Sequence, residues 1–172
     1  NFFEENINKN IKLIRVMPNT PVKVKKGTTA IVGNLNVNKR DILLTEKMFN
    51  SIGETIKIKN EELMDILTAI SGSGPAYIFY IIEELTKLGN EYGLSYNDAK
   101  LISLNNVIGS ALLARNTEVS LKDLRIDVTS PGGTTEAALE VFTDKEIGFS
   151  PLIRKTIKKA FLRSKELGLD EI

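Results

Sequence analysis

A proline and two glycines at residues 131–133 break the chain just before a helix-like run at residues 135–142. Such a turn exposes the backbone, and the first turn of a helix has four N–H groups without an intrahelical partner. Glycines let an anion approach those groups without a Cβ in the way, and Thr134 and Thr135 add two hydroxyls. The segment therefore predicts a site for a small anion such as a carboxylate.

The same loop is also compatible with a helix start that binds nothing. Ser-Pro and Gly-Gly dipeptides punctuate many turns, and Thr134 is an acceptable N-cap residue. On this loop alone, the two interpretations carry about equal weight. Other segments of the chain have to decide between them.

The composition excludes several kinds of chemistry. The 172 residues include no Cys and no His, which excludes disulfides, thiol nucleophiles, Ser-His and Cys-His pairs and His-based metal sites. The formal net charge of +1 indicates neither a nucleic acid nor a membrane surface as a partner. The apolar runs are too interrupted for a membrane span, and no secretory signal is visible. Any catalysis must use a cofactor, hydroxyls, carboxylates or backbone amides, and no metal is expected.

The first part of the chain predicts strands. Short apolar segments at residues 11–16, 28–32 and 55–58 alternate with a helix at residues 39–52, as in an α/β sheet. Three strands are too few for such a domain, and the first residue is Asn. We therefore expect residues 1–60 to be the end of a larger α/β domain.

The second part of the chain predicts only helices. Caps, prolines and glycines place them at residues 61–70, 75–88, 98–115, 121–125, 135–142 and 152–167. Two of them are apolar nearly all round, because residues 101–114 carry no charge and residues 76–82 are all aliphatic or aromatic. A surface helix of a small monomer has a polar face, so we expect a homodimer that shares these helices. A monomer with one central buried helix is the alternative.

Two further segments have spacings seen in cofactor sites. Residues 71–77 contain a Gly-x-Gly, but Tyr77 holds the third glycine position and Pro75 removes an N–H that a pyrophosphate would use. We interpret that segment as a tight helix–helix junction. Residues 17–19 follow the first strand, where ligands bind in open α/β sheets, and the Asn19 amide complements a nicotinamide carboxamide. A proline-stiffened exit loop without a ligand is the alternative.

Three segments, at residues 15–21, 71–77 and 128–139, resemble pyrroline-5-carboxylate reductase in sequence and in order. The string Val-Thr-Ser-Pro-Gly-Gly-Thr-Thr is the most specific of them. The resemblance implies an α/β remnant of a Rossmann-like nucleotide-binding domain at residues 1–60. An all-α dimerisation and substrate-binding domain at residues 61–172 follows it, so that the protein is mainly helical. The active site is then expected between the domains, at the dimer interface.

The resemblance also implies the reaction and the residues that carry it. The enzyme reduces 1-pyrroline-5-carboxylate to L-proline with NADPH or NADH, the last step of proline biosynthesis. Thr135 is the expected catalytic residue, because it hydrogen-bonds the ring nitrogen. The residues expected to bind the substrate are Val128, Ser130, Gly132, Gly133, Thr134 and Thr135, and those expected beside the nicotinamide are Met17, Pro18 and Asn19. The Gly-rich cofactor loop of the family is absent from this sequence, so the chain alone is expected to be inactive.

Two other functions stay open from the sequence. One is a non-catalytic oligomerisation module. The other is a different NAD(P)-dependent reductase with a helical dimer domain, which usually needs a Lys or His acid/base in its helical part. The expected partners are pyrroline-5-carboxylate or proline and a second copy of the chain, with a higher oligomer left open. Nucleic acid and membrane are not expected as partners, and the expected location is cytoplasmic.

Overall fold

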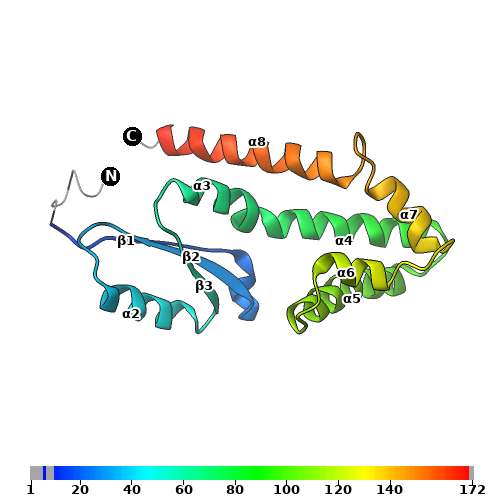
Figure 1. Cartoon of the computed structure of the whole chain (residues 1–172), viewed down its shortest axis with the longest axis horizontal. Helices are drawn as coiled ribbons and strands as arrows, with labels where there is room; N and C mark the ends of the chain where they lie inside the picture. Colours follow the sequence, from blue (N-terminus) through cyan, green and yellow to red (C-terminus); the bar gives the residue numbers. More distant parts are fainter. Residues whose placement is uncertain (1–5, 7–9, 171–172) are drawn as a thin grey trace. The chain divides into compact units, whose positions relative to one another are not determined.

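The computed structural model describes residue 6 and residues 10–170, and its strands form one small sheet (Figure 1). The strands β1 (Ile14–Pro18), β2 (Gly27–Gly33) and β3 (Gly53–Lys57) lie in the order β1-β2-β3. β1 runs antiparallel to β2, and β3 runs parallel to it. The three predicted strands are therefore confirmed, in a sheet that is mixed. The outermost residues of both predicted domains lie outside the described residues.

The middle strand β2 carries the core of the sheet. Thr29, Ala30 and Ile31 are consecutive and all buried, as expected for a strand covered on both faces. The hydroxyl of Thr29 is buried and has no hydrogen-bond partner within the part of the chain that the structure describes. The strand is therefore buried over consecutive residues rather than at alternate ones.

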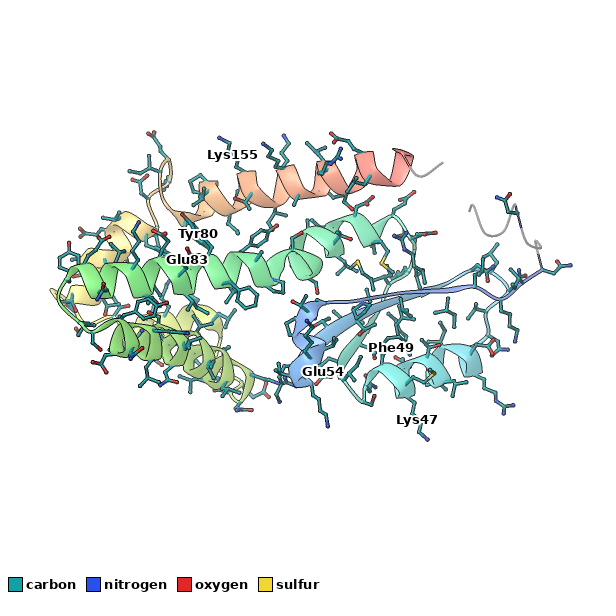
Figure 2. The ribbon with its side chains drawn as sticks, turned by 180° about the vertical axis from the view of Figure 1, so that it is seen from behind. Lys47, Phe49, Glu54, Tyr80, Glu83 and Lys155 are labelled. Carbon is teal, nitrogen blue, oxygen red and sulfur yellow. The ribbon has the colours of Figure 1, made fainter. Side chains whose placement is uncertain are left out.

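The helix α2 (Lys39–Phe49) connects the parallel strands β2 and β3 and contacts both of them. It begins with a capping box, in which the Asn38 side chain accepts from the Asp41 N–H and the Asp41 carboxylate accepts from the Asn38 N–H. Phe49 points from α2 towards the strands, while Lys47 points away from them (Figure 2). The predicted helix at residues 39–52 is confirmed, with an earlier end.

The segment predicted as one helix at residues 61–70 is divided by a change of helix type. A short α3 (Leu63–Leu67) leads into η2 (Thr68–Gly72), which is a π-helix, and then into α4 (Gly74–Glu91). The Ser73 N–H donates to the Thr68 carbonyl at 2.8 Å, five residues back, which is the π-helical spacing. The prediction of a plain helix was therefore wrong at this point. A 3-10 helix, η1 (Thr20–Val24), follows β1 and was not predicted.

The other helices agree with the sequence prediction apart from their ends. They are α5 (Tyr96–Arg115), α6 (Leu121–Asp127), α7 (Thr134–Phe142) and α8 (Phe149–Asp170). Ser95 caps α5 by accepting from the Asp98 N–H. Gly133, not Thr134, is the N-cap of α7, and Gly168 lies within α8 instead of ending it. A helix can include a glycine at a modest cost when its neighbours favour helix.

The chain divides into two compact units. The first comprises Asn1–Pro75 and Thr156–Ile172, and contains the sheet together with the buried Met64 and Ala69. The second, Ala76–Lys155, is entirely helical and includes the buried Ala99 and Ser103. The predicted domain boundary after residue 60 stays a prediction.

One stretch of the described residues, Leu63–Glu91, is long and apolar enough to cross a membrane by length and composition alone. The core helix of a soluble protein passes the same test, so this is weak evidence for a membrane. The sequence had indicated that the apolar runs are too interrupted. The structure joins them because the π-helix continues the helical path through the Gly-Ser segment.

Candidate functional site

The Gly-rich loop before α7 is a type II β-turn. The Gly133 N–H donates to the Ser130 carbonyl at 3.0 Å, which closes four residues with Pro131 in the second position. Gly132, in the third position, has a φ of +69°, as a type II turn requires. At Gly133 a Cβ would lie 3.0 Å from the Ser130 carbonyl oxygen and closer still to its hydroxyl. The two glycines are thus required by the turn itself.

A glutamate that the sequence analysis did not single out takes part in this turn. Glu136 is the third residue of α7, and its Oε2 accepts from the Gly132 N–H at 2.7 Å. A Glu at this position commonly reaches back to a backbone N–H before the helix, which is the signal that could have identified it. The N–H groups of Gly132 and Gly133 are therefore both engaged within the protein.

The hydrogen-bond donors that remain for a ligand belong to the two residues after the turn. Thr134 and Thr135 are the first two residues of α7, so their N–H groups have no intrahelical acceptor. Within the described part of the chain, neither threonine hydroxyl has a hydrogen-bond partner, and Thr135 is half-buried whereas Thr134 is exposed. This pair of amides and hydroxyls, at the positive end of a helix, is suited to a carboxylate.

The other predicted substrate residues flank the turn. Val128 is the C-cap of α6, and its side chain is 64% exposed. The helix ends there because the Thr129 N–H and hydroxyl bond back to Ile126 and Arg125 carbonyls. Ser130 is exposed and supplies the carbonyl that closes the turn. Val128, Ser130 and the two threonines thus lie within eight consecutive residues of the second unit.

The predicted cofactor residues Met17, Pro18 and Asn19 lie in the first unit, at the carboxyl end of β1. The Asn19 N–H donates to the Thr28 carbonyl at 3.2 Å, and Asn19 Oδ1 accepts from the Thr28 N–H at 2.8 Å. Asn19 Nδ2 donates to Ser71. The amide that the sequence analysis offered to a nicotinamide therefore already has partners in the protein, and one lone pair of Oδ1 remains for a ligand.

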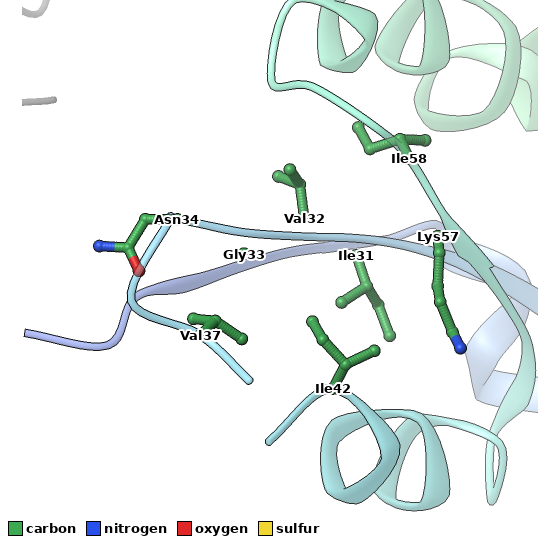
Figure 3. Close-up of a pocket in the computed structure, with 8 residues that line it drawn as sticks. All are labelled: Ile31, Val32, Gly33, Asn34, Val37, Ile42, Lys57 and Ile58. Carbon is green, nitrogen blue, oxygen red and sulfur yellow. The ribbon is translucent and has the colours of Figure 1, made fainter. Parts of the chain in front are cut away.

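A cavity in the first unit (Figure 3) is lined by none of the predicted site residues. Its volume is about 210 Å³, and Ile31 of β2 and Ile42 of α2 point towards one another in it. The amine of Lys57 pairs with Glu46 at 3.0 Å. Because its lining is mainly aliphatic, this cavity is a gap in the packing between α2 and the sheet.

No group of three or more acidic, His or Cys side chains suited to a metal ion occurs among the residues that the structure describes. Two carboxylates near the loops are instead used for local structure. The Ile147 and Glu146 N–H groups hold the pKa of Asp144 below its ordinary value, and the hydrogen bond from Lys12 lowers the pKa of Asp41. Both serve as caps of turns or helices.

Together these features define a class: a mainly helical protein that joins a small mixed sheet to an all-α unit with a Gly-rich turn before α7. Residues 61–167 match the protein family described as pyrroline-5-carboxylate reductase dimerisation. That match covers more than half of the sequence, and the chain belongs to this family. The resemblance noted in its three segments is confirmed.

Curated relatives and solved structures agree with this assignment. The pyrroline-5-carboxylate reductase of Synechocystis is 39% identical over 91% of this chain, and that of Pseudomonas aeruginosa is 36% identical over 91%. The structure of the Coxiella burnetii reductase superposes with a TM-score of 0.90 at 38% identity over 95% of this chain. The Plasmodium falciparum enzyme with NADP bound gives a TM-score of 0.87 at 35% identity over 96%.

The chain spans only part of these proteins. It covers 57% of the Synechocystis and 56% of the Pseudomonas relative, and 60% and 66% of the two solved chains. The family and the fold of the matched part are therefore shown, whereas the activity of a whole enzyme needs its own argument.

Proposed function

We propose that this protein acts as a pyrroline-5-carboxylate reductase, which reduces 1-pyrroline-5-carboxylate to L-proline with NADPH or NADH. The observation that carries the proposal is the start of α7, where Thr134 and Thr135 offer two unpaired amides and two unpaired hydroxyls. The substrate carboxylate needs hydrogen-bond donors, and the ring nitrogen beside it needs a group that can both accept and donate, such as a hydroxyl. The membership of residues 61–167 in the dimerisation family supports this reaction over other anion-binding roles.

The proposed roles start from the substrate carboxylate. It accepts hydrogen bonds from the N–H groups of Thr134 and Thr135, where the helix dipole contributes about 0.3–1 kcal/mol and charge-assisted bonds add to it. Since Gly132 and Gly133 use their own N–H groups in the turn, their role is to shape the backbone. Ser130 fixes the turn through its carbonyl and presents its hydroxyl to the same ligand.

The Thr135 hydroxyl is the group that we assign to the ring nitrogen. It stands in the second position of α7, and its half-buried setting limits competition from water. A hydroxyl can accept a hydrogen bond from a protonated imine and donate one to the amine that follows. Val128 covers the apolar part of the ring with its exposed side chain. This geometry needs neither His nor Cys, in agreement with the composition.

The proposed cofactor residues leave one hydrogen-bond acceptor for a nicotinamide. NAD(P)H, when bound, supplies the hydride. The loop Met17–Asn19 ends a strand at the sheet edge, and Asn19 Oδ1 keeps one lone pair for a carboxamide N–H. We therefore propose that β1 to β3 and α2 belong to a Rossmann-like nucleotide-binding domain, although the antiparallel β1 departs from an all-parallel sheet.

We further propose that the chain acts as a homodimer through its helical unit. In α5, the residues Leu101, Ile102, Ile108, Leu112 and Leu113 are all exposed in the single chain. In α4, Phe79 and Tyr80 are 64% and 61% exposed. Exposed apolar surface on this scale marks a protein contact, and the family description supports a second copy as the partner.

A cytoplasmic location forms part of the proposal. The apolar stretch Leu63–Glu91 includes Thr68 and Ser71, whose side chains bond to the loop Met17–Asn19 of the first unit. Because an open sheet edge does not occur within the hydrocarbon of a bilayer, the end of the stretch that is bonded to this strand loop lies outside it. Cell fractionation that finds the protein in the membrane would contradict this location.

The direct test is an assay of the full-length protein with 1-pyrroline-5-carboxylate and NADPH, followed by loss of NADPH absorbance and formation of L-proline. Proline formation supports the proposal. A dimer that neither forms proline nor binds it would favour the oligomerisation module. Reduction of a different substrate would favour another NAD(P)-dependent reductase.

A further inference from the structure

The loop Met17–Asn19 is tied to the π-helix η2 over a long sequence distance. Asn19 Nδ2 lies 3.1 Å from Ser71 Oγ and 3.3 Å from the Ser71 carbonyl, and donates to both. The hydroxyl of Thr68, three residues earlier, lies 3.1 Å from Met17 Sδ. Both contacts are partly buried and lie within the first compact unit. The loop proposed beside the nicotinamide is therefore supported by one turn of η2.

The availability of the Ser71 carbonyl follows from the sequence. In an α-helix this carbonyl would accept from the N–H of residue 75, and residue 75 is proline, which has no N–H. The π-helical bond from the Ser73 N–H goes to Thr68 and leaves Ser71 unaffected. Pro75 thus leaves an acceptor that Asn19 occupies.

The π-helix is held in place by burial and by a side-chain hydrogen bond. Ala69 is fully buried, and the Thr68 hydroxyl, which lies near Met17 Sδ, has the Met64 carbonyl as its stronger acceptor at 2.8 Å. Single π-turns inside α-helices recur at functional sites, where they move a side chain out of the regular helical register. Ser71 lies on such a turn, and its hydroxyl accepts from the side-chain amide of Asn19 in the proposed cofactor loop.

We propose that Ser71 is a positioning residue for the nicotinamide cofactor, acting through Asn19. The two ends of the Asn19 amide have separate tasks. Oδ1 binds the Thr28 N–H and continues the pairing of β1 with β2, whereas Nδ2 binds Ser71 and fixes the rotation of the amide plane. Losing the Ser71 hydroxyl leaves the strand pairing intact and removes the nearer of the two acceptors of Nδ2, so that the amide plane is held less tightly. The inference rests on the proposed function, because it requires that a nicotinamide lies at this loop.

The test compares three variants of the full-length protein. Ser71→Ala removes the acceptor hydroxyl, and Ser71→Thr keeps one. Ser73→Ala is the matched control, since it makes the same change two residues further on, where the hydroxyl has no partner among the described residues. The measurements are the Kd for NADPH by fluorescence, the Kd for L-proline, and the thermal midpoint.

For Ser71→Ala we expect an NADPH Kd raised by about 2- to 12-fold, the range for one neutral hydrogen bond. The L-proline Kd should stay within about twofold, as for a neutral surface change, and Ser71→Thr and Ser73→Ala should bind NADPH like the unsubstituted protein. A lowered thermal midpoint with unchanged NADPH binding means that the contact is only structural, and overturns the inference. Equal NADPH binding by Ser71→Ala and Ser73→Ala overturns it as well.

A second variant covers the case in which Ser71→Ala does not fold. Asn19→Asp keeps an oxygen for the Thr28 N–H and removes the donor to Ser71. Weaker NADPH binding by this variant is expected, and unchanged binding overturns the inference. If the unsubstituted protein neither binds NADPH nor makes proline, the proposed function itself has failed, which is a different outcome from a failure of Ser71 alone.

Discussion

The carboxylate of Glu136 accepts a hydrogen bond from the Gly132 N–H at 2.7 Å, and so places a negative charge beside the loop that we assign to the substrate carboxylate. The contact fixes the turn and supplies a favourable charge at the start of α7. It also sets a like charge close to an incoming anion. The same residue therefore stabilises the site and weakens its affinity.

Replacing Glu136 with Gln separates these two effects. The amide keeps an acceptor for the Gly132 N–H and loses the charge. Two unit charges about 5 Å apart in water repel by roughly 0.8 kcal/mol, so L-proline should bind up to about 4-fold more tightly. The free energy of unfolding should fall by about 0.3–1 kcal/mol, because a charge at the helix start is lost. Calorimetric titration and urea unfolding measure the two changes. Weaker proline binding would contradict the charge argument.

Thr135→Val keeps the shape of the side chain and deletes the hydroxyl assigned to the ring nitrogen. A lost hydrogen bond to a charged group costs about 1.5–3 kcal/mol. That cost lowers kcat/KM by roughly 10- to 150-fold. Thr134→Val is the matched control and should have a smaller effect if only its N–H meets the carboxylate. Steady-state kinetics decide, and a loss at Thr134 alone would mean that the two roles are exchanged.

Ile108→Asp should convert the dimer into monomers. Ile108 is 53% exposed in the single chain and lies in the uncharged run of α5, so a partner would bury the new carboxylate without a counter-ion. Light scattering at micromolar concentration measures the mass. Lys100→Asp, on the same helix, is the control and should stay dimeric. A monomeric unsubstituted protein would disprove the homodimer.

The turn between α7 and α8 should lose stability in acid. The Ile147 and Glu146 N–H groups donate to Asp144 and lower its pKa below the ordinary 3.8. This stabilisation is present above pH 3.8 and is lost as the pH falls through the lower folded-state pKa. Asp144→Asn should therefore lower the thermal midpoint at neutral pH, and the difference should vanish in acid. A difference that is independent of pH would show that the charge is irrelevant.

Lys25→Gly should stabilise the first unit. Lys25 has a φ of 57°, a left-handed conformation that costs a residue with a Cβ about 1–2 kcal/mol. Glycine relieves that strain and loses about 0.5–1 kcal/mol of backbone entropy, so a net gain of up to about 1.5 kcal/mol is expected. Urea unfolding measures the gain. Lys26→Gly is the control and should not stabilise, since glycine there brings only the entropic loss.

The sequence by itself determined the features that depend on neighbours in the chain. Helix caps at Asn38 and Ser95, the apolar strand β2 and the turn before α7 all follow from residues within a few positions of each other. The type II turn is such a case, because Pro131 and Gly132 have only a small set of backbone conformations. The conformation of the loop that we propose for the substrate could therefore be predicted before any coordinates were known, although Glu136 was overlooked.

The tertiary structure alone decided which distant residues meet. Asn19 and Ser71 are 52 positions apart, and Thr68 and Met17 are 51 apart, so no periodicity in the sequence records either contact. The antiparallel direction of β1 and the π-helix at Thr68–Gly72 are equally non-local, because they depend on how whole elements pack. The amide of Asn19 looked free for a ligand from its type and position. Only the folded chain shows that its hydrogen bonds are already shared with Thr28 and Ser71.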